Sequence, residues 1–295
     1  MVELWFGLLC FMLTMFVVLD GWDIGAGALH LIVAKTAAER REVIAAIGPL
    51  WSWHEVWLVA AGGTFLLAFP GVMAASFSGF YLALWMALWS LILRGVSIEV
   101  GGHIPDRLWQ AWWDFVFAAS SLFLALLFGA AFGNVIRGVP IDVTGTFSMS
   151  LFTDFGVRGR VGILDWYTVS VAVFATLLLA AHGATYLRLK TTARVHDRSE
   201  RLARRLWTGF RERAEARTFA GSCAIVAGLL DGFAAAVFPV MLHSTLDASY
   251  SLTAYRGAAA GGGLRIALVW WPLAFALAIA YLVIVLRSYR GRVTS

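Results

Sequence analysis

The chain has 295 residues, of which 60% are hydrophobic and only 14% are charged, and its mean hydropathy is +0.78. Soluble globular domains carry about 25% charged residues, so this composition excludes a soluble domain and predicts a polytopic membrane protein. The net charge of +5 comes with clusters of Lys and Arg, for which we expect anionic membrane lipid, and no nucleic acid, as the partner.

Seven apolar stretches are long enough to cross a bilayer as helices. Together they predict an all-α transmembrane bundle that forms one integral membrane domain over residues 1–295. The second stretch is interrupted by His54, Glu55 and Pro70, but the run Val56–Phe69 is too lipophilic for a loop. The predicted spans are residues 4–33, 44–70, 78–98, 112–135, 163–187, 217–240 and 265–286.

Two carboxylates, Asp20 and Asp23, lie inside the first span, where a lipid-facing helix could hardly carry them. On a helix, these residues recur with Gly27 and His30 at steps of three and four, which places all four on one face. The face predicts an internal proton or cation route. The structural alternative is a break in the helix near the glycines, with the aspartates hydrogen-bonded to it.

Lys and Arg gather after the first, third, fifth and seventh spans. By the positive-inside rule these ends face the cytoplasm, so we expect the N-terminus outside, in the periplasm, and the C-terminus inside. The first span has no basic start and is expected to remain in the mature chain. The largest basic segment, residues 188–216, is predicted to be a cytoplasmic loop. The basic residues that follow the first, third and seventh spans are Lys35, Arg40, Arg41, Arg94, Arg107, Arg287, Arg290 and Arg292.

The second span places His54 and Glu55 on one helical face with Trp51 and Leu58. With the predicted orientation, this pair lies in the cytoplasmic half of the membrane, as the two aspartates of the first span do. An imidazole and a carboxylate can therefore meet the polar face of the first span in a route that opens to the cytoplasm. The alternative for the pair is a helix start at the membrane interface.

Other polar and small residues in the spans have structural interpretations. Arg94 and Glu99 are predicted to form an ion pair or a lipid contact near the inner surface. His182 is expected to be a packing histidine, and His30 to be interfacial or cytoplasmic. The glycine pairs Gly21–Gly25 and Gly62–Gly63 predict close approach between helices.

Short motifs recur in a definite order along the chain. The early ones are Leu19–Gly27, Ile47–Trp51, Glu55–Leu58, Ala61–Phe65 and Ala68–Pro70, and the later ones are Phe77–Tyr81, Leu91–Gly95, Phe132–Asn134, Gly138–Pro140 and Gly183–Leu187. In order and spacing they resemble subunit II of the cytochrome bd-type quinol oxidases, and the resemblance covers nearly the whole chain. Each motif is weak alone, but the combination is specific.

The resemblance implies a non-haem subunit of a terminal oxidase in the bacterial cytoplasmic (inner) membrane. Its heterodimer partner, subunit I, would hold haem b and haem d-type groups and the quinol site. The complex would oxidise quinol, reduce oxygen to water with protons taken from inside, and generate a proton-motive force. This chain would support assembly and provide a proton or oxygen access route. It would bind no metal and no haem itself. A structural quinone or lipid is the one direct ligand that the resemblance allows.

Within that resemblance, Asp20, Asp23 and Glu55 are the expected proton-conducting set. The segment Trp51–Glu55 reads Trp-Ser-Trp-His-Glu where typical members read Trp-Asp-Gly-Asn-Glu, so Ser52 stands in place of the usual aspartate. We expect Glu55 to take over that role, with Ser52 and His54 holding water or orienting it. The alternatives are a relay through His54, a relay through water held by Ser52, or no use of this route.

The chain also departs from the family in its second half. After the Gly183–Leu187 motif and the basic segment, it continues to Phe238–Met241 and Ser251–Thr253, which resemble late family motifs, so about two helices are expected to be missing internally. Asp231, in the sixth span, lies outside the family pattern. It either lines a replacement polar path, as a further member of the proton route, or is a protonated, hydrogen-bonded structural residue.

A stand-alone proton or cation transporter or channel is the alternative function. Such a protein would be expected to show inverted repeats or broken helices at matching positions of two halves. The sequence shows only one short internal similarity, between Leu19–Trp22 and Leu230–Phe233. The motifs therefore favour the oxidase subunit.

Overall fold

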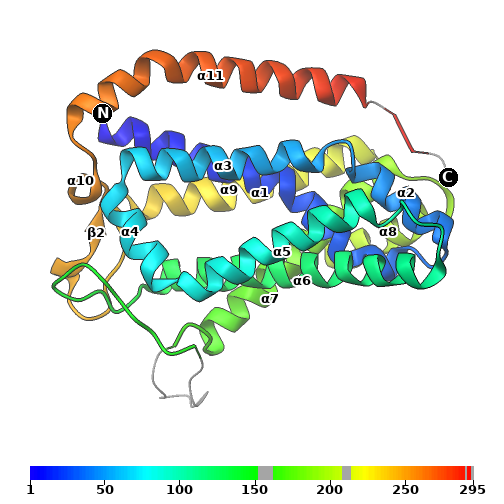
Figure 1. Ribbon diagram of the computed structural model, residues 1–295, viewed down its shortest axis with the longest axis horizontal. Helices are drawn as coiled ribbons and strands as arrows, with labels where there is room; N and C mark the ends of the chain where they lie inside the picture. The colour runs from blue at the N-terminus through cyan, green and yellow to red at the C-terminus, as the bar shows by residue number, and fades with distance from the viewer. Residues whose placement is uncertain (152–161, 208–213, 290, 294–295) are drawn as a thin grey trace.

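The computed structural model describes residues 1–151, 162–207, 214–289 and 291–293. Long helices lie side by side in an elongated bundle (Figure 1). Six helices in the described residues are long and apolar enough to cross a membrane, which confirms the predicted all-α polytopic bundle. They are α1 (Val2–Val33), α5 (Tyr81–Val100), α6 (Arg107–Arg137), α7 (Trp166–Lys190), α9 (Glu215–Val237) and α11 (Gly261–Ser288).

The second predicted span is divided in the structure. Helices α2 (Ala37–Ile47) and α3 (Trp51–Ala68) meet at a bend of 44°, and counting this pair as one span gives seven. The sequence analysis predicted a single helix over residues 44–70, and this prediction is wrong. Pro49 lies at the break and explains it, because proline lacks a backbone donor and disfavours a helical residue before it. Pro70 opens the next helix, α4 (Pro70–Gly79), where a missing donor costs little.

Helix α1 lies at the centre of the bundle and contacts α3, α6, α7 and α9. Its small residues let neighbouring backbones touch. A Cβ atom added to Gly25 would lie 1.9 Å from the Leu179 carbonyl oxygen of α7, and one added to Gly183 would lie 2.3 Å from the Ala26 nitrogen. The predicted close approach at Gly25 is thus confirmed. For Gly62 and Gly63 it is wrong within this chain, because no atom lies within 4 Å of either added Cβ.

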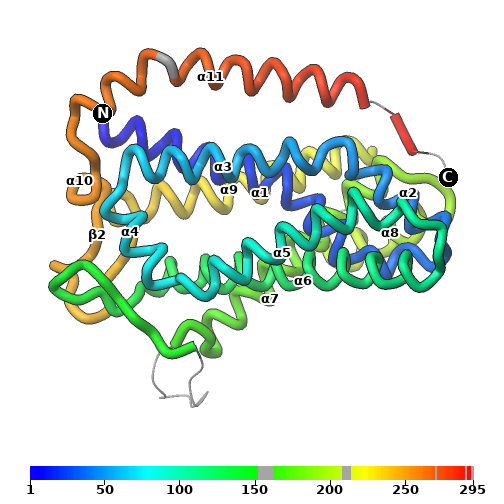
Figure 2. The backbone as a smooth tube through the Cα atoms, viewed as in Figure 1, coloured from blue at the N-terminus to red at the C-terminus, as the bar shows by residue number. Residues whose placement is uncertain are grey.

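Different elements and termini lie at the two ends of the bundle. At one end lie the N-terminus, α10 (Ala254–Gly257) and the antiparallel strands β1 (Val240–Leu242) and β2 (Leu252–Thr253), with the short 3₁₀ helix η1 (Ala248–Tyr250) between the strands. At the other lie α2, α8 (Ala193–Leu206) and the C-terminus (Figures 1 and 2). The termini at opposite ends fit an odd number of crossings.

Helix α8 occupies much of the basic segment 188–216. It packs Val195, Ser199 and Ala203 inward and exposes Arg201, Arg204 and Arg205. Arg198 ties it to α2 through an ion pair with Glu39 at 2.8 Å. The segment predicted as a loop is therefore largely helical in its described part, and Arg211 and Arg213 lie outside the described residues.

Helix α11 runs along the edge of the bundle beside α1 and α3 (Figure 2). Aromatic pairs link it to them, including Trp5 with Trp271 at 6.0 Å and Trp53 with Tyr281 at 4.0 Å between ring centroids. Many of its other side chains are exposed, as expected for a helix that faces lipid on one side.

Candidate functional site: a buried charge cluster between three helices

Helix α1 is continuous from Val2 to Val33, so the aspartates do not stabilise a helix break, and that alternative is wrong. Asp20 and Asp23 are both fully buried and face other helices of the bundle. Buried carboxylates need partners that compensate their charge. The structure provides these partners from α3 and α5.

Arg94 of α5 pairs with two carboxylates at once. Its Nη2 donates to Asp20 Oδ1 at 2.5 Å and to Glu55 Oε1 at 2.8 Å. Arg94 and Asp20 are fully buried, whereas the Glu55 side chain is 25% exposed. Charge-assisted hydrogen bonds of this kind are among the strong ones, and here they connect α1, α3 and α5.

This pairing corrects the predicted Arg94–Glu99 ion pair. Glu99 instead accepts a hydrogen bond from the Trp51 indole at 3.1 Å. Arg94 and Glu99 are five residues apart on one helix, so their side chains point in different directions. The sequence analysis therefore missed Arg94 as a member of the site. The available signal was a lone arginine in an apolar span with two unpaired acids in neighbouring spans.

His54 completes the arrangement. Its Nδ1 lies 2.6 Å from Asp23 Oδ2, and both side chains are fully buried. The indole of Trp22 packs edge-on against the imidazole, with ring centroids 5.0 Å apart. The structure thus confirms the predicted meeting of the His54–Glu55 pair with the polar face of the first span. The pair also lies near the start of α3, as the alternative expected.

We refer to Asp20, Asp23, His54, Glu55 and Arg94 as the charge cluster. Ligand atoms of Asp20, Asp23 and His54 all lie within 4.8 Å of one another, so the two pairings form one site. Three carboxylates face one guanidinium and one imidazole. Because uncompensated negative charge is costly in a buried site, these acids depend on Arg94 and His54 as partners.

The cluster has further hydrogen-bonding capacity. Five of its polar atoms are buried and have no hydrogen-bond partner among the described residues: Asp20 Oδ2, Asp23 Oδ1, His54 Nε2, Arg94 Nε and Arg94 Nη1. Buried polar groups of this kind are usually bridged by water. A metal ion fits less well, although carboxylate and imidazole are suitable ligands, because the Arg94 guanidinium already places positive charge 2.5 Å from Asp20.

The remaining predicted site residues lie outside the charge cluster. Ser52 is exposed near the start of α3. Asp231 of α9 accepts a hydrogen bond from the Thr14 hydroxyl at 2.7 Å. Thr14 precedes Asp20 by six residues, about 9 Å along α1. The roles of Ser52 and Asp231 in a proton route stay predictions.

Two other histidines have clear structural partners. His182 lies 2.8 Å from the Ser222 hydroxyl and 2.9 Å from the Val18 carbonyl oxygen, which confirms its prediction as a packing histidine. His30 is fully buried and lies 3.0 Å from Asp114, which also accepts from Arg40 at 2.9 Å. Its interfacial or cytoplasmic position stays a prediction. Asp114 was not singled out from the sequence.

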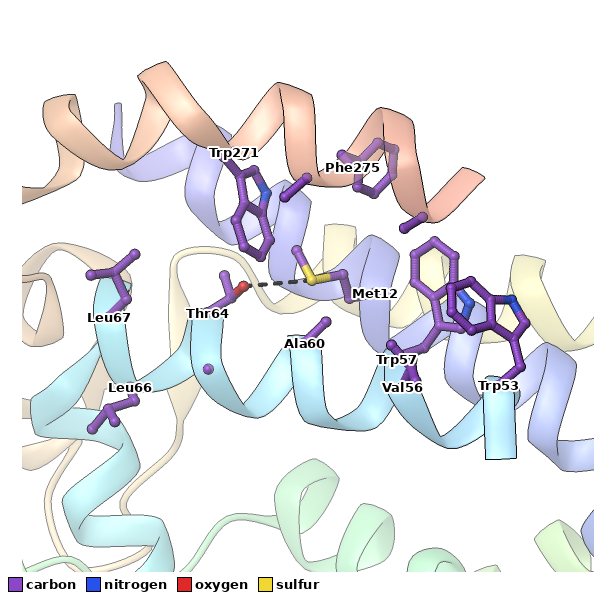
Figure 3. A pocket seen from close by; sticks show the side chains of 13 residues that line it. Met12, Trp53, Val56, Trp57, Ala60, Thr64, Leu66, Leu67, Trp271 and Phe275 are labelled. Atoms are coloured by element: carbon purple, nitrogen blue, oxygen red, sulfur yellow. Dashed lines mark hydrogen bonds between the residues drawn. The ribbon is translucent and has the colours of Figure 1, made fainter. Parts of the chain in front are cut away.

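An apolar cavity of about 700 Å³ lies between α1, α3 and α11 (Figure 3). Trp53 and Trp57 lie at one end of its α3 wall and Leu66 and Leu67 at the other, and Trp271 and Phe275 face them from α11. Thr64 donates a hydrogen bond to the Met12 sulfur at 3.5 Å on the cavity wall. The lining is almost entirely apolar, so the cavity suits an apolar chain.

These features define a class: a polytopic helical membrane protein with a buried charge cluster between its helices. Residues 1–211 match the model of the family described as cytochrome bd terminal oxidase subunit II. The chain belongs to this family. The match includes the whole charge cluster and ends before α9, so the resemblance of residues 238–241 and 251–253 to late family motifs, and the loss of about two helices, stay predictions.

Curated relatives carry the same description. The chain is 36% identical over 200 residues to the probable cytochrome oxidase subunit 2 of Haemophilus influenzae, which covers 66% of this chain and 50% of that protein. It is 36% identical over 208 residues to the cytochrome bd-I ubiquinol oxidase subunit 2 of Escherichia coli K12, covering 68% and 52%. For the cytochrome bd ubiquinol oxidase subunit 2 of Bacillus subtilis the identity is 31% over 205 residues, covering 69% and 58%. The chain thus spans about half the length of the relatives it matches.

Among solved structures, the bd oxidase from Geobacillus thermodenitrificans is similar, with a TM-score of 0.46 and 14% identity. The similarity covers 79% of this chain and 54% of that chain.

Proposed function

We propose that this chain is the non-haem subunit of a cytochrome bd-type oxidase that oxidises quinol and reduces oxygen to water. It would form a heterodimer with a haem-bearing subunit I in the bacterial inner membrane. The family match over residues 1–211 and the names of the relatives support this function over a stand-alone transporter. The observation that carries it furthest is the charge cluster, which lies entirely within the matched residues.

The role of this chain in the complex is to deliver protons. Asp20, Asp23 and Glu55 carry them, and His54 exchanges protons with Asp23 across their 2.6 Å contact. Arg94 orients Asp20 and Glu55. Glu55 is the partly exposed carboxylate of the cluster, so protons enter or leave there. Ser52, one turn before Glu55 on α3, holds water at this opening, and Asp231 remains a candidate for a separate branch.

The route opens to the cytoplasm. This proposal takes the end that carries α2, α8 and the C-terminus as the cytoplasmic end, because the exposed arginines of α8 and the basic residues Lys35, Arg40 and Arg41 gather there. The exposed arginines of α8 then face anionic lipid headgroups. The N-terminus and the β1–β2 ribbon face the periplasm.

Haem b and haem d-type groups belong to the partner subunit in this proposal, as does the quinol site. The direct ligand of this chain is a structural quinone or lipid in the apolar cavity between α1, α3 and α11.

The test is to purify the chain from its native membrane in mild detergent and to record a reduced-minus-oxidised visible spectrum. We expect a larger partner and bands of b- and d-type haem. A chain that purifies alone and colourless across several detergents contradicts the oxidase proposal. The charge cluster should then be assayed for ion flux in liposomes, as a transporter would require.

A further inference from the structure

A second buried polar group lies on α1 beyond the charge cluster, toward the end of the bundle that carries α2 and α8. His30 is fully buried three residues before the end of α1. Its Nε2 lies 3.0 Å from Asp114 Oδ1 of α6, and Arg40 of α2 donates to Asp114 Oδ2 at 2.9 Å. The proposed proton route through Glu55 uses none of these three residues.

This group connects the interior with the surface. The side chain of Asp114 is 18% exposed, whereas the imidazole of His30 beside it is fully buried. The ring of Phe117 packs edge-on against the imidazole, with centroids 5.1 Å apart, and helps to close it off. Imidazole gains and loses a proton near neutral pH, so a partly exposed carboxylate beside a buried imidazole is suited to pass protons inward.

The other ring nitrogen of His30 has no partner that explains its burial. Nδ1 is buried and has no hydrogen-bond partner among the described residues. The same holds for the hydroxyl oxygen of Ser121 on α6 and for Asp23 Oδ1 of the charge cluster. Unpaired buried polar atoms are usually bridged by water. Three of them in neighbouring turns therefore favour a short water-linked path.

The hydroxyl of Ser121 lies between the two ends of this path. On α1, Gly27 is three residues, about 4.5 Å, from His30 and four residues, about 6 Å, from Asp23. A Cβ atom added to Gly27 would lie 2.1 Å from Ser121 Oγ. The hydroxyl thus takes the space that a side chain at position 27 would fill. One water joins two polar atoms about 5.5 Å apart, so one water on each side of the hydroxyl completes the path.

We propose that Asp114 and His30 form a second proton entrance to the charge cluster. The path continues through water and the Ser121 hydroxyl to Asp23. A proton held by Asp114 passes to Nε2 of the imidazole while Nδ1 releases one toward Ser121, so the ring is neutral before and after the transfer. The inference rests on the proposed function and adds a separate entrance to the one at Glu55.

The experiment is oxygen consumption by the purified complex in H₂O and in D₂O, with the two entrances closed separately and together. Glu55→Gln and His30→Gln each close one entrance, because an amide forms hydrogen bonds but does not relay protons. Each alone should lower the rate about two- to threefold, since the other entrance remains, and the double variant should lower it at least about tenfold. The ratio of the rates in H₂O and D₂O should rise in the double variant, because proton delivery then limits turnover. Loss of a purely structural contact would not raise this ratio.

Ser121→Ala, added to Glu55→Gln, should act as His30→Gln does. Ser120→Ala is the matched control, because Ser120 is the adjacent buried serine of α6 and its hydroxyl already donates to the Phe117 carbonyl oxygen at 3.2 Å. Equal effects of the two serine variants overturn the path.

The outcomes separate this inference from the function on which it rests. If the unmodified complex consumes oxygen and Glu55→Gln behaves alike with and without His30→Gln, in rate and in isotope ratio, the second entrance is wrong and the proposed function stands. If the unmodified protein carries no haem bands and consumes no oxygen, the proposed function is wrong and this inference with it.

Discussion

Arg94 supplies the one guanidinium of the charge cluster, and three helices depend on it. It is fully buried and donates to carboxylates of α1 and α3 from its own helix α5. Removing one partner of a buried ion pair leaves uncompensated charge, which costs far more than the net contribution of the intact pair. The residue therefore positions the acids and need not itself exchange protons.

We expect Arg94→Leu to destabilise the protein by about 3–5 kcal/mol, because Asp20 and Glu55 would then be buried without compensation. Thermal unfolding of the purified complex measures this. Adding Asp20→Asn and Glu55→Gln to Arg94→Leu should recover part of the loss, since the buried negative charge disappears with its partner. A triple variant no more stable than Arg94→Leu alone would show that Arg94 acts by packing.

Asp20→Asn should lower oxygen consumption without removing the haem spectrum of the complex. The amide cannot release a proton, but it retains an oxygen that can accept from Arg94, so the fold remains intact. Glu99→Gln is the control. Glu99 is an acid near the end of α5 that accepts a hydrogen bond from Trp51 and lies outside the charge cluster. Equal oxygen consumption in both variants would exclude Asp20 from the proton route.

At the scale of elements, the contact between α1 and α7 depends on two glycines that face each other. A Cβ at Gly25 would lie 1.9 Å from a backbone oxygen of α7, and backbone cannot rotate away as a side chain can. The two helices would have to separate over their whole contact. The buried carboxylates of α1 lie within this stretch.

Gly25→Ala should therefore destabilise the protein by about 3 kcal/mol or more. Gly63→Ala on α3 should change stability by less than about 1 kcal/mol or raise it, because the added methyl group meets open space and alanine favours the helix. Yield of folded protein and thermal midpoint in detergent distinguish the two. A similar response of both variants would contradict the close backbone contact.

Helix α8 contains an acid with a pH-dependent contribution to stability. Burial raises the pKa of Glu200, but the hydrogen bond and charge of Arg204, with the charges of Arg188 and His196, outweigh it, so the pKa lies below the ordinary 4.5. The folded form thus favours the ionised carboxylate. Its contribution is fully present above pH 4.5 and is lost as the pH falls through the lowered pKa.

Glu200→Gln should remove this dependence. As the pH falls below 4.5, the thermal midpoint of the unmodified protein should fall more steeply than that of the variant. Asp197→Asn on the exposed side of the same helix is the control and should follow the unmodified protein. Parallel curves for Glu200→Gln and the unmodified protein would show that the ion pairs of α8 do not contribute.

At the scale of the whole molecule, the proposed orientation can be tested by labelling. A cysteine at Arg205 of α8 should react with a membrane-impermeant maleimide only from the cytoplasmic side, and one at Thr144, in the connection at the other end, only from outside. Cys10 and Cys223 should first be replaced by serine, since both are partly exposed. Labelling of both positions from one side would contradict the proposed topology.

The sequence predicted the spans because each is a long apolar run, and hydropathy over about 20 residues depends little on tertiary contacts. It also predicted that Asp20, Asp23, His54 and Glu55 would meet. It did not predict that Arg94 pairs with Glu55 and Asp20, which lie 39 and 74 positions earlier in the chain. Helical periodicity shows which face of a helix is polar, but not which other helix that face contacts. Nor did it show that Asp231 lies on an open face of α9, which depends on what the other helices cover.

The pairing of Arg94 with two helices that precede it in the chain also constrains how the protein is made. An arginine in an inserting helix costs up to about 3.5 kcal/mol, the cost being largest at the helix centre, so α5 alone is a poorer substrate for membrane insertion than an apolar helix. When α1 and α3 are already in the bilayer, Asp20 and Glu55 offer this arginine its counter-charges as it enters. Insertion of α5 is therefore coupled to the successful insertion of the helices synthesised before it, and a nascent chain with a misplaced first helix would be held back at the third predicted span.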